Sequence, residues 1–213
     1  APFNDADFAA ALIDEYADEI AGVIVEPLQR TIPPVPGFLE ALRSKTTEHG
    51  IILIFDEIVT GFRLAYGGAQ EKYTVVPDLC TLGKIIGGGL PLAAITGREE
   101  VMRHFDKAAV GEDGFTFQTG TLSGNPLASI AGLKTLEILR RPGSYERLND
   151  LGTRLMRAIS DPLSAHNIPH QIVGDPTLFD VVFTGNPVTN YRDILTSDTN
   201  RAAIFNAAVR EKN

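Results

Sequence analysis

The sequence predicts an α/β fold with a mostly parallel sheet, and three observations support this prediction. Short apolar runs typical of strands alternate with segments whose apolar residues recur at helical spacing. Residues 51–55 form a continuous apolar run, the pattern of a strand buried on both faces of a parallel sheet. This run ends in two carboxylates, Asp56 and Glu57, and ligands of such sheets bind beyond the carboxyl ends of the strands. We therefore expect both charges to face a site rather than the core.

The elements up to residue 142 follow from the apolar pattern and from residues that begin or end helices. Asp5 or Asp7 is expected to cap a first helix that includes Phe8, and Asn125 followed by proline suits the start of another. In chain order the sequence predicts that first helix, a short buried strand over 21–25, a helix from 38 to about 49, strands over 51–55, 78–82 and 91–96, a helix over 98–105, a strand over 115–118, and a helix from 126 to about 139.

A different pattern begins near Gly143. Proline and glycine at 142–143 end the preceding helix, whose last residues, Arg140 and Arg141, suit the helix dipole. Beyond them the sequence predicts a helix over 145–159, antiparallel strands over 171–173 and 178–183, and a helix over 202–209. This change from strand–helix alternation to a helix plus hairpin predicts a domain boundary, with a large domain over 1–142 and a small α+β domain over 143–213.

Composition argues against several classes of protein. The formal net charge of −8, without any basic run, argues against nucleic-acid binding. No apolar run approaches the roughly 18 residues that a membrane span requires. The single cysteine, Cys80, rules out an internal disulfide, and the acidic N-terminal segment is unlike a secretory signal, so we expect a cytoplasmic protein. His166 and His170 are separated by Pro169, which breaks the helix that would place them together, so no metal site is expected.

Lys84 is the second candidate site residue after Asp56. It is flanked by apolar residues and by the glycines at 87–89, and a secluded lysine can act as a nucleophilic amine. A strand-end aspartate and such a lysine are the two protein groups that pyridoxal phosphate requires, one for the ring nitrogen and one for the Schiff base. A helix cap and a surface charge are the ordinary alternatives for these two residues. A Walker B strand would also end in Asp-Glu, but it needs a P-loop, and Ile85 stands where that motif has serine or threonine.

Five motifs together resemble the class III pyridoxal-phosphate-dependent aminotransferases, most closely the branch that resembles glutamate-1-semialdehyde aminomutase. In order, they are VEP at 25–27, DEIVTGFR at 56–63, PDL at 77–79 leading to GK at 83–84, GGLP at 88–91 and GTLSGNP at 120–126. The resemblance implies the fold type I large domain followed by the beginning of the small domain. It also implies a chain that is incomplete at both ends, because it begins after the phosphate-binding segment of the family.

The resemblance further implies roles for the site residues. Lys84 would form the Schiff base and move the proton, Asp56 would pair with the pyridine nitrogen, and Ile58 would pack against the ring. Thr121, in a loop with Gly120, would bind the phosphate of the neighbouring subunit's cofactor, which implies a homodimer with shared sites. Glu26 lies at a strand end within reach of the site.

Three functions remain open from the sequence. The first is an aminotransferase that moves an amino group between a small-molecule donor and a carbonyl acceptor. The second is an intramolecular 2,1-aminomutase, towards which Val59 points, because the family often has glutamine there. The third is a non-catalytic fragment that cannot retain the cofactor, since the resemblance places part of the phosphate site outside this chain.

Overall fold

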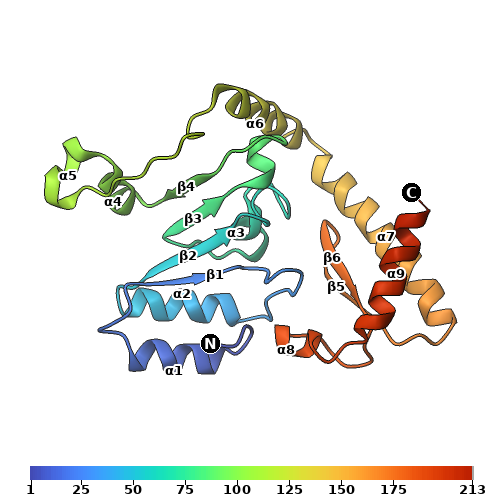
Figure 1. Cartoon of the computed structure of the whole chain (residues 1–213). Coiled ribbons are helices and arrows are strands. Elements are labelled where there is room, and N and C mark those ends of the chain that lie inside the picture. The colour runs from blue at the N-terminus through green and yellow to red at the C-terminus, as the bar shows by residue number, and fades with distance from the viewer. Residues whose placement is uncertain (213) are drawn as a thin grey trace.

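The computed structural model describes residues 1–212 and contains a four-stranded sheet and a separate hairpin (Figure 1). The first three strands of the sheet are parallel, and the fourth pairs antiparallel with the third. The strands, in spatial order, are β1 (Gly22–Val25), β2 (Ile52–Glu57), β3 (Leu79–Leu82) and β4 (Ala94–Gly97), and the hairpin is β5 (Gln171–Asp175) and β6 (Leu178–Val182). The predicted α/β class with a mostly parallel sheet is confirmed.

Helices connect these strands and extend the chain beyond them. The sequence prediction missed four of the short helical elements, namely α3, the 3₁₀ turn η1, α5 and α8. The helical elements are α1 (Ala6–Glu15), α2 (Phe38–Glu48), α3 (Gly68–Tyr73), η1 (Lys84–Gly87), α4 (Glu99–Met102), the 3₁₀ turn η2 (Arg103–Phe105), α5 (Lys107–Gly114), α6 (Pro126–Leu139), α7 (Ser144–Ala165), α8 (Tyr191–Ile194) and α9 (Thr199–Glu211). None of the helices within residues 1–212 is both long enough and apolar enough to cross a membrane.

The main core lies between the sheet and the layer formed by α1 and α2 (Figure 1). Leu53 and Phe55 of β2 are completely buried there, against Leu39 and Leu42 of α2. Asp5 caps α1 as predicted, because its carboxylate accepts a hydrogen bond from the backbone N–H of Phe8 at 3.0 Å. Buried residues of the C-terminal hairpin, Val173 and Val182, belong to the same apolar cluster.

The two faces of β2 differ, which corrects the prediction of a strand buried on both faces. Leu53, Phe55 and Glu57 are buried, whereas Ile52, Ile54 and Asp56 on the opposite face are only partly buried. The strand predicted over 21–25 exists as β1, but the prediction that it is buried is wrong, because β1 is an edge strand with exposed residues. An unbroken apolar run shows that both faces are suited to burial, but it does not show that the described chain covers both.

Two predicted elements between β3 and α6 differ from the structure. Residues 115–118 form no strand, since no neighbouring strand pairs with them in the described structure, and Phe117 is 76% exposed. Phe115 and Phe117 instead contact each other edge to face, with ring centroids 6.3 Å apart. The predicted helix over 98–105 is divided between α4 and η2, and the strand expected over 91–96 begins only at Ala94.

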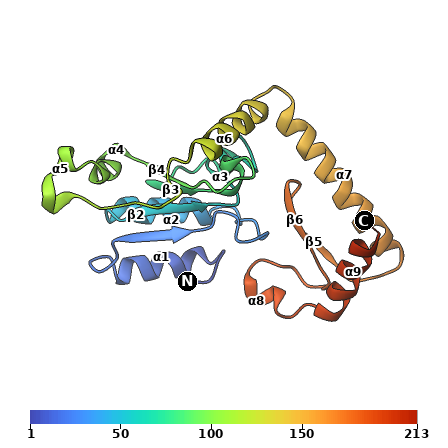
Figure 2. The ribbon, with the colours of Figure 1, turned by 45° about the horizontal axis from the view of Figure 1, so that its top comes forward.

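The C-terminal part, from α7 to α9, extends away from α6 in both ribbon views (Figures 1 and 2). α7 ends six residues beyond the predicted end at residue 159. Pro162 lies in its last turn, where its carbonyl still accepts a hydrogen bond from His166 N at 3.2 Å. Gly143, with a φ of 82°, separates α6 from α7. The domain boundary near this residue stays a prediction.

Candidate functional site

The candidate site lies where β2 and β3 end, on the face opposite to α2. Asp56 stands near the end of β2, directly across from Thr81 of β3 in the parallel register. The hydroxyl of Thr81 and the backbone N–H of Ile58 both donate to Asp56 Oδ1, each at 3.1 Å. The second carboxylate oxygen, Oδ2, has no hydrogen-bond partner among residues 1–212. Asp56 is thus held in one orientation with one oxygen available to a ligand.

Glu57 points away from this site, contrary to the prediction that both carboxylates face it. Its side chain is 1% exposed and accepts hydrogen bonds from the Thr60 hydroxyl (2.9 Å), the backbone N–H of Ala69 (2.6 Å) and the Gln70 amide (2.9 Å). Successive side chains of a strand point to opposite faces, so the alternation of β2 would have indicated this difference. Glu57 is a buried carboxylate that fixes the beginning of α3.

Gly68 is required at the contact between Glu57 and α3. Its φ is +69°, a conformation that residues with a side chain rarely adopt. A Cβ atom at this position would lie 2.3 Å from Glu57 Oε2. The glycine therefore allows the backbone of α3 to approach the buried carboxylate.

Lys84 follows the end of β3 and begins the η1 turn. Its φ of 47° is left-handed, which is unusual for a residue other than glycine, asparagine or aspartate, and such strain is common at functional sites. The side chain is exposed, so the seclusion expected from its apolar neighbours is absent. Within the described part of the chain it forms no hydrogen bond or ion pair, which leaves its amine free.

Ile58 connects Asp56 to the turn that carries Lys84. A Cβ atom placed on Gly83 would lie 3.0 Å from Ile58 Cδ1, so the isoleucine packs directly against the residue before Lys84. The structure therefore brings three predicted site residues, Asp56, Ile58 and Lys84, to the ends of two neighbouring strands.

The loop containing Gly120 and Thr121 lies near the same end of the sheet. Gly120 lines a cavity of about 880 Å³ together with Ile58 and Thr81, and most of the remaining lining is apolar. Thr121 is exposed in the turn and does not line this cavity. The predicted helix start after the loop is correct, since Asn125 Oδ1 accepts from the backbone N–H groups of Leu127 at 3.0 Å and Ala128 at 3.2 Å.

Glu26 lies beside Asp56, one strand away. The parallel register pairs Val25 with Phe55, which places the following residues, Glu26 and Asp56, next to each other. Both line a groove of about 550 Å³ along β1. Glu26 Oε2 accepts a weak hydrogen bond of 3.3 Å from the backbone N–H of Arg30. The prediction that Glu26 lies at a strand end near the site is consistent with this position.

A family comparison now identifies the chain. The model of the class III aminotransferases ("Aminotransferase class-III") matches residues 4–208. The chain belongs to the class III aminotransferase family. This confirms the resemblance inferred from the five sequence motifs.

Individual relatives agree with this assignment. The chain is 45% identical over 207 residues to glutamate-1-semialdehyde 2,1-aminomutase 2 of Brevibacillus brevis, covering 96% of this chain and 47% of the relative. A crystal structure of an omega-transaminase from Sphaerobacter thermophilus superposes with a TM-score of 0.87 at 38% identity, over 94% of this chain and 46% of that one. A transaminase with PLP bound has a TM-score of 0.80 at 27% identity, over 89% and 45% of the two chains. The chain thus spans about half the length of the relatives it matches.

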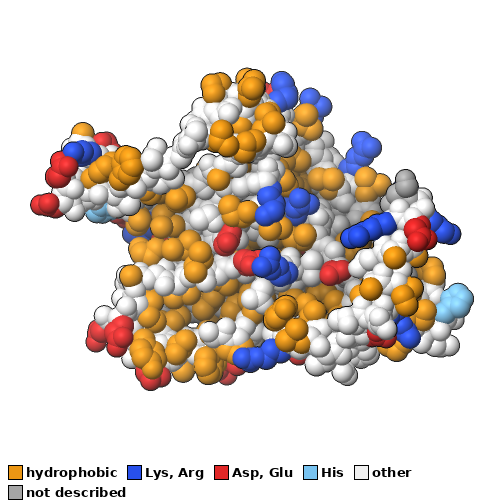
Figure 3. Space-filling view, viewed as in Figure 1, with side chains coloured by type: hydrophobic (Ala, Val, Ile, Leu, Met, Phe, Trp, Pro, Cys, Tyr) orange, Lys and Arg blue, Asp and Glu red, His pale blue; other side chains and the backbone are white. Residues whose placement is uncertain are grey.

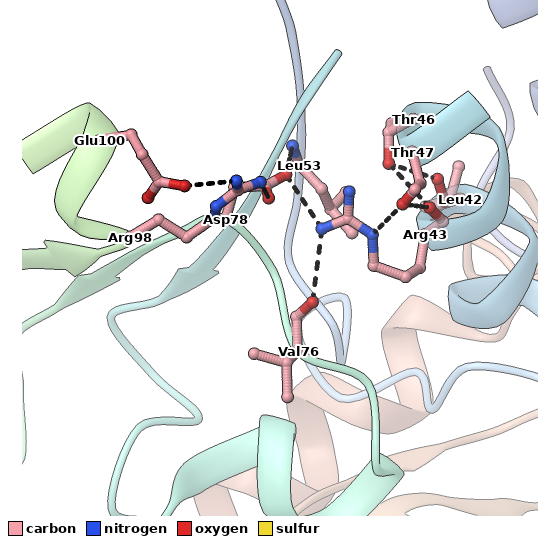
Figure 4. A network of polar contacts seen from close by, with 9 residues as sticks. All are labelled: Leu42, Arg43, Thr46, Thr47, Leu53, Val76, Asp78, Arg98 and Glu100. Atoms are coloured by element: carbon pink, nitrogen blue, oxygen red, sulfur yellow. Dashed lines mark hydrogen bonds and ion pairs between the residues drawn. The ribbon is translucent and has the colours of Figure 1, made fainter. Parts of the chain in front are cut away.

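The PDL motif of the class III aminotransferases contains a residue whose role the sequence prediction missed. Asp78 is buried and accepts hydrogen bonds from the backbone N–H of Leu53 (2.8 Å), Arg43 Nη1 (2.9 Å) and Arg98 Nη1 (2.9 Å), as Figure 4 shows. Burial alone would raise the pKa of Asp78, but the hydrogen bonds from Leu53, Arg98 and Arg43 outweigh it and hold the pKa below its usual value. This Asp78 clamp joins α2, β2 and the segment after β4.

The acidic cluster formed by Asp14, Glu48 and His49 lies on the surface between α1 and α2. Lys45 Nζ bonds to Asp14 at 2.9 Å and to Glu48 at 3.1 Å, and His49 Nε2 lies 2.7 Å from Asp14. A lysine ammonium already occupies the centre of the group, so its carboxylates serve an ion-pair network between the two helices.

Proposed function

We propose that this chain forms the cofactor-binding part of a pyridoxal-phosphate-dependent aminotransferase, which moves an amino group from a small-molecule donor to a carbonyl acceptor. The observation that carries the proposal is the placement of Asp56 and Lys84 at the ends of neighbouring parallel strands, with the Ile58 side chain against Gly83, the residue before Lys84. Family membership and the transaminase relatives support it.

The residues present fit the cofactor. A pyridine nitrogen needs a carboxylate with a free oxygen, and Asp56 Oδ2 has no partner within residues 1–212. An aldehyde needs an unpaired amine, which Lys84 provides. When bound, pyridoxal phosphate supplies a ring that withdraws electrons from the substrate carbon.

The residues then have distinct tasks. Lys84 would hold the cofactor through Nζ, and its free amine would take up and return the proton at the substrate carbon. Asp56 would keep the ring nitrogen protonated, and the Asp56 carboxylate is oriented by Thr81 and by the backbone N–H of Ile58. The Ile58 side chain would pack against one face of the ring.

The assignment of Lys84 can be tested by borohydride reduction of the holoenzyme followed by peptide mapping. We expect the pyridoxyl adduct on Lys84, and its loss in Lys84→Ala. Lys134→Ala, which removes an exposed lysine paired with Glu137, is the matched control and should retain the adduct. An adduct on Lys72, Lys107 or Lys134 would disprove the assignment, and no adduct on any lysine would favour a non-catalytic fragment.

The role of Asp56 has a separate test. Asp56→Asn is nearly isosteric and should still allow the cofactor to bind, but without a negative charge the ring nitrogen loses its proton. We expect a cofactor-loaded variant whose half-reaction rate is lower by at least about 100-fold, the lower end for a group that controls proton position. An unchanged rate would show that another group protonates the ring.

We also propose that the enzyme works as a homodimer in which the loop of Gly120 and Thr121 binds the phosphate of the partner's cofactor. The loop precedes the N-terminus of α6, where backbone N–H groups favour an anion. Mixing Lys84→Ala with Thr121→Ala holoenzyme tests the sharing, because a mixed dimer then contains one site with both residues intact. Activity no higher than that of the separate variants, despite proven subunit exchange, would contradict it.

A second candidate is intramolecular amino transfer, as in an aminomutase. It is favoured by Val59 and by the 45% identity to a glutamate-1-semialdehyde 2,1-aminomutase. An aminomutase converts the semialdehyde with no second substrate, whereas an aminotransferase requires a separate donor and acceptor. Turnover of glutamate-1-semialdehyde alone would therefore select the second candidate. The cytoplasmic location stays a prediction from the sequence.

A further inference from the structure

The tip of the C-terminal hairpin, residues 175–178, lies against the segment that follows β2. Arg63 Nη1 donates a hydrogen bond of 3.3 Å to the carbonyl of Thr177, which is 114 residues away in the chain. Leu178 packs against a second buried cluster, which consists of Leu28, Leu64 and Ala69. In Figure 3, basic and acidic side chains lie close together in the middle of this face, between the sheet and the C-terminal part. The hairpin tip therefore connects the two parts of the chain.

Asp175 of the hairpin tip is arranged to bind Lys72 of α3. Its Oδ2 lies 2.5 Å from Lys72 Nζ. The other oxygen, Oδ1, accepts hydrogen bonds from the backbone N–H of Thr177 at 3.2 Å and from the Thr177 hydroxyl at 3.0 Å. Because the Asp175 side chain is only 7% exposed, loss of Lys72 would leave a buried charge without a cation. The carboxylate is thus fixed in the orientation that binds α3.

The hairpin tip is also held by α7. A Cβ atom on Gly152 of α7 would lie 1.9 Å from the carbonyl oxygen of Pro176, so the backbone of the helix is in direct contact with the tip. The ion pair with Lys72 therefore joins α3 to a tip that α7 already restrains.

α3 in turn holds the carboxyl end of β2. The backbone N–H of Ala69 donates to Glu57 Oε2 at 2.6 Å, and the side-chain amide of Gln70 donates to Glu57 Oε1 at 2.9 Å. Glu57 is the last residue of β2 and directly follows Asp56. Contacts therefore run without interruption from the hairpin tip, through α3, to the strand end that carries Asp56.

We propose that Asp175 is a positioning residue for the candidate site and acts through Lys72 and α3 on the carboxyl end of β2. The hairpin tip holds α3, α3 holds Glu57, and Glu57 restrains the strand end from which Asp56 extends. A series of contacts carries coupling only if a change at one end alters the other. The importance of Asp175 for the reaction rests on the proposed function, whereas its effect on the strand end can be measured without the cofactor.

Amide hydrogen exchange of the chain tests this coupling at three positions. The backbone N–H of Ala69 reports the contact between α3 and β2, and that of Ile58 reports the orientation of Asp56. The backbone N–H of Leu53, in the middle of β2, reports opening of the whole sheet. In Asp175→Asn we expect exchange to accelerate at least about tenfold at the first amide and about threefold at the second. The third amide should change by less than about threefold.

Variants of both partners separate the ion pair from other effects. Lys72→Met should accelerate exchange at the same two amides, whereas Lys72→Arg keeps the positive charge and should retain most of the protection. Asp175→Asn keeps an acceptor for Thr177, so the hairpin itself should remain folded. The matched control is Asp180→Asn, which removes an exposed carboxylate from β6 of the same hairpin and should leave all three amides unchanged.

The holoenzyme provides the second readout. Asp175→Asn should bind pyridoxal phosphate at least about threefold more weakly, measured by titration at the absorbance of the cofactor. Unchanged exchange at Ala69 and Ile58, equal acceleration at all three amides, or unchanged cofactor affinity would each overturn the proposal. Failure of the unmodified protein to bind the cofactor would instead refute the proposed function, and the exchange rates would still decide whether Asp175 restrains the strand end.

Discussion

Replacing Asp78 by alanine is expected to lower the free energy of unfolding by about 2–3 kcal/mol. The largest contribution comes from the backbone N–H of Leu53, a completely buried residue whose donor would lose its partner, at a cost of about 1–3 kcal/mol. The ion pair with Arg43, whose side chain is 24% exposed, adds about 0–1 kcal/mol. Arg98 is largely exposed and simply returns to water.

The assay is urea unfolding of the chain followed by circular dichroism at neutral pH. Asp78→Asn should be less destabilising than Asp78→Ala, because an amide oxygen can still accept from Leu53 N. Asp18→Ala, which removes an exposed aspartate without a hydrogen bond among the described residues, should leave stability unchanged. A loss below about 0.5 kcal/mol for Asp78→Ala would refute the argument, since surface substitutions alone produce changes of that size.

The effect of Asp78 should also depend on pH. Its pKa in the folded chain lies below the ordinary value of 3.8, so the carboxylate stabilises the fold fully above that value. This stabilisation is lost as the pH falls through the lower, folded-state pKa. The difference between the wild-type chain and Asp78→Ala should therefore shrink in acid, and a constant difference down to the acid transition would contradict the assignment.

Three further predictions concern local features. Burial, together with the nearby carboxylates of Glu57 and Asp56, raises the pKa of Cys80 to about 12. Its thiol should therefore react with a disulfide reagent at pH 8 only when the chain unfolds, and rapid labelling of the folded chain would contradict this. Gly68→Ala should cost about 1–3 kcal/mol, measured by urea unfolding, because of its left-handed φ and the approach to Glu57. Asn125→Ala should cost about 1 kcal/mol by removing the α6 cap, whereas Asn125→Ser should restore most of it.

Local sequence was sufficient for the elements whose signals are short-range. The apolar run before Asp56 predicted β2, and Asn125 followed by proline predicted the start of α6. The strand-end placement of Asp56 follows from the same local signals, whereas the η1 turn at Lys84 was missed, and the site residues stay predictions.

Longer-range features could not be predicted in the same way. The partner of Asp56, Thr81, depends on the register between β2 and β3, and the partners of Asp78 lie 20 to 35 residues away in the chain. Residues 115–118 have a strand-like composition, but a strand exists only if a neighbour pairs with it. That Glu57 points to the buried face of β2 was predictable, because successive side chains of a strand point to opposite faces. The prediction that Glu57 faces the site was wrong because it treated Asp56 and Glu57 as one group.

The left-handed backbone of Lys84 has a consequence for the balance between stability and activity. A non-glycine residue in this conformation is about 1–2 kcal/mol less stable than in its preferred one. Glycine relieves that strain but adds about 0.5–1 kcal/mol of unfolded-state entropy, so Lys84→Gly should leave the fold equally or slightly more stable. A lysine at a position where the backbone favours glycine agrees with the chemical role proposed for Lys84. Selection for stability alone would remove the amine on which the proposed reaction depends.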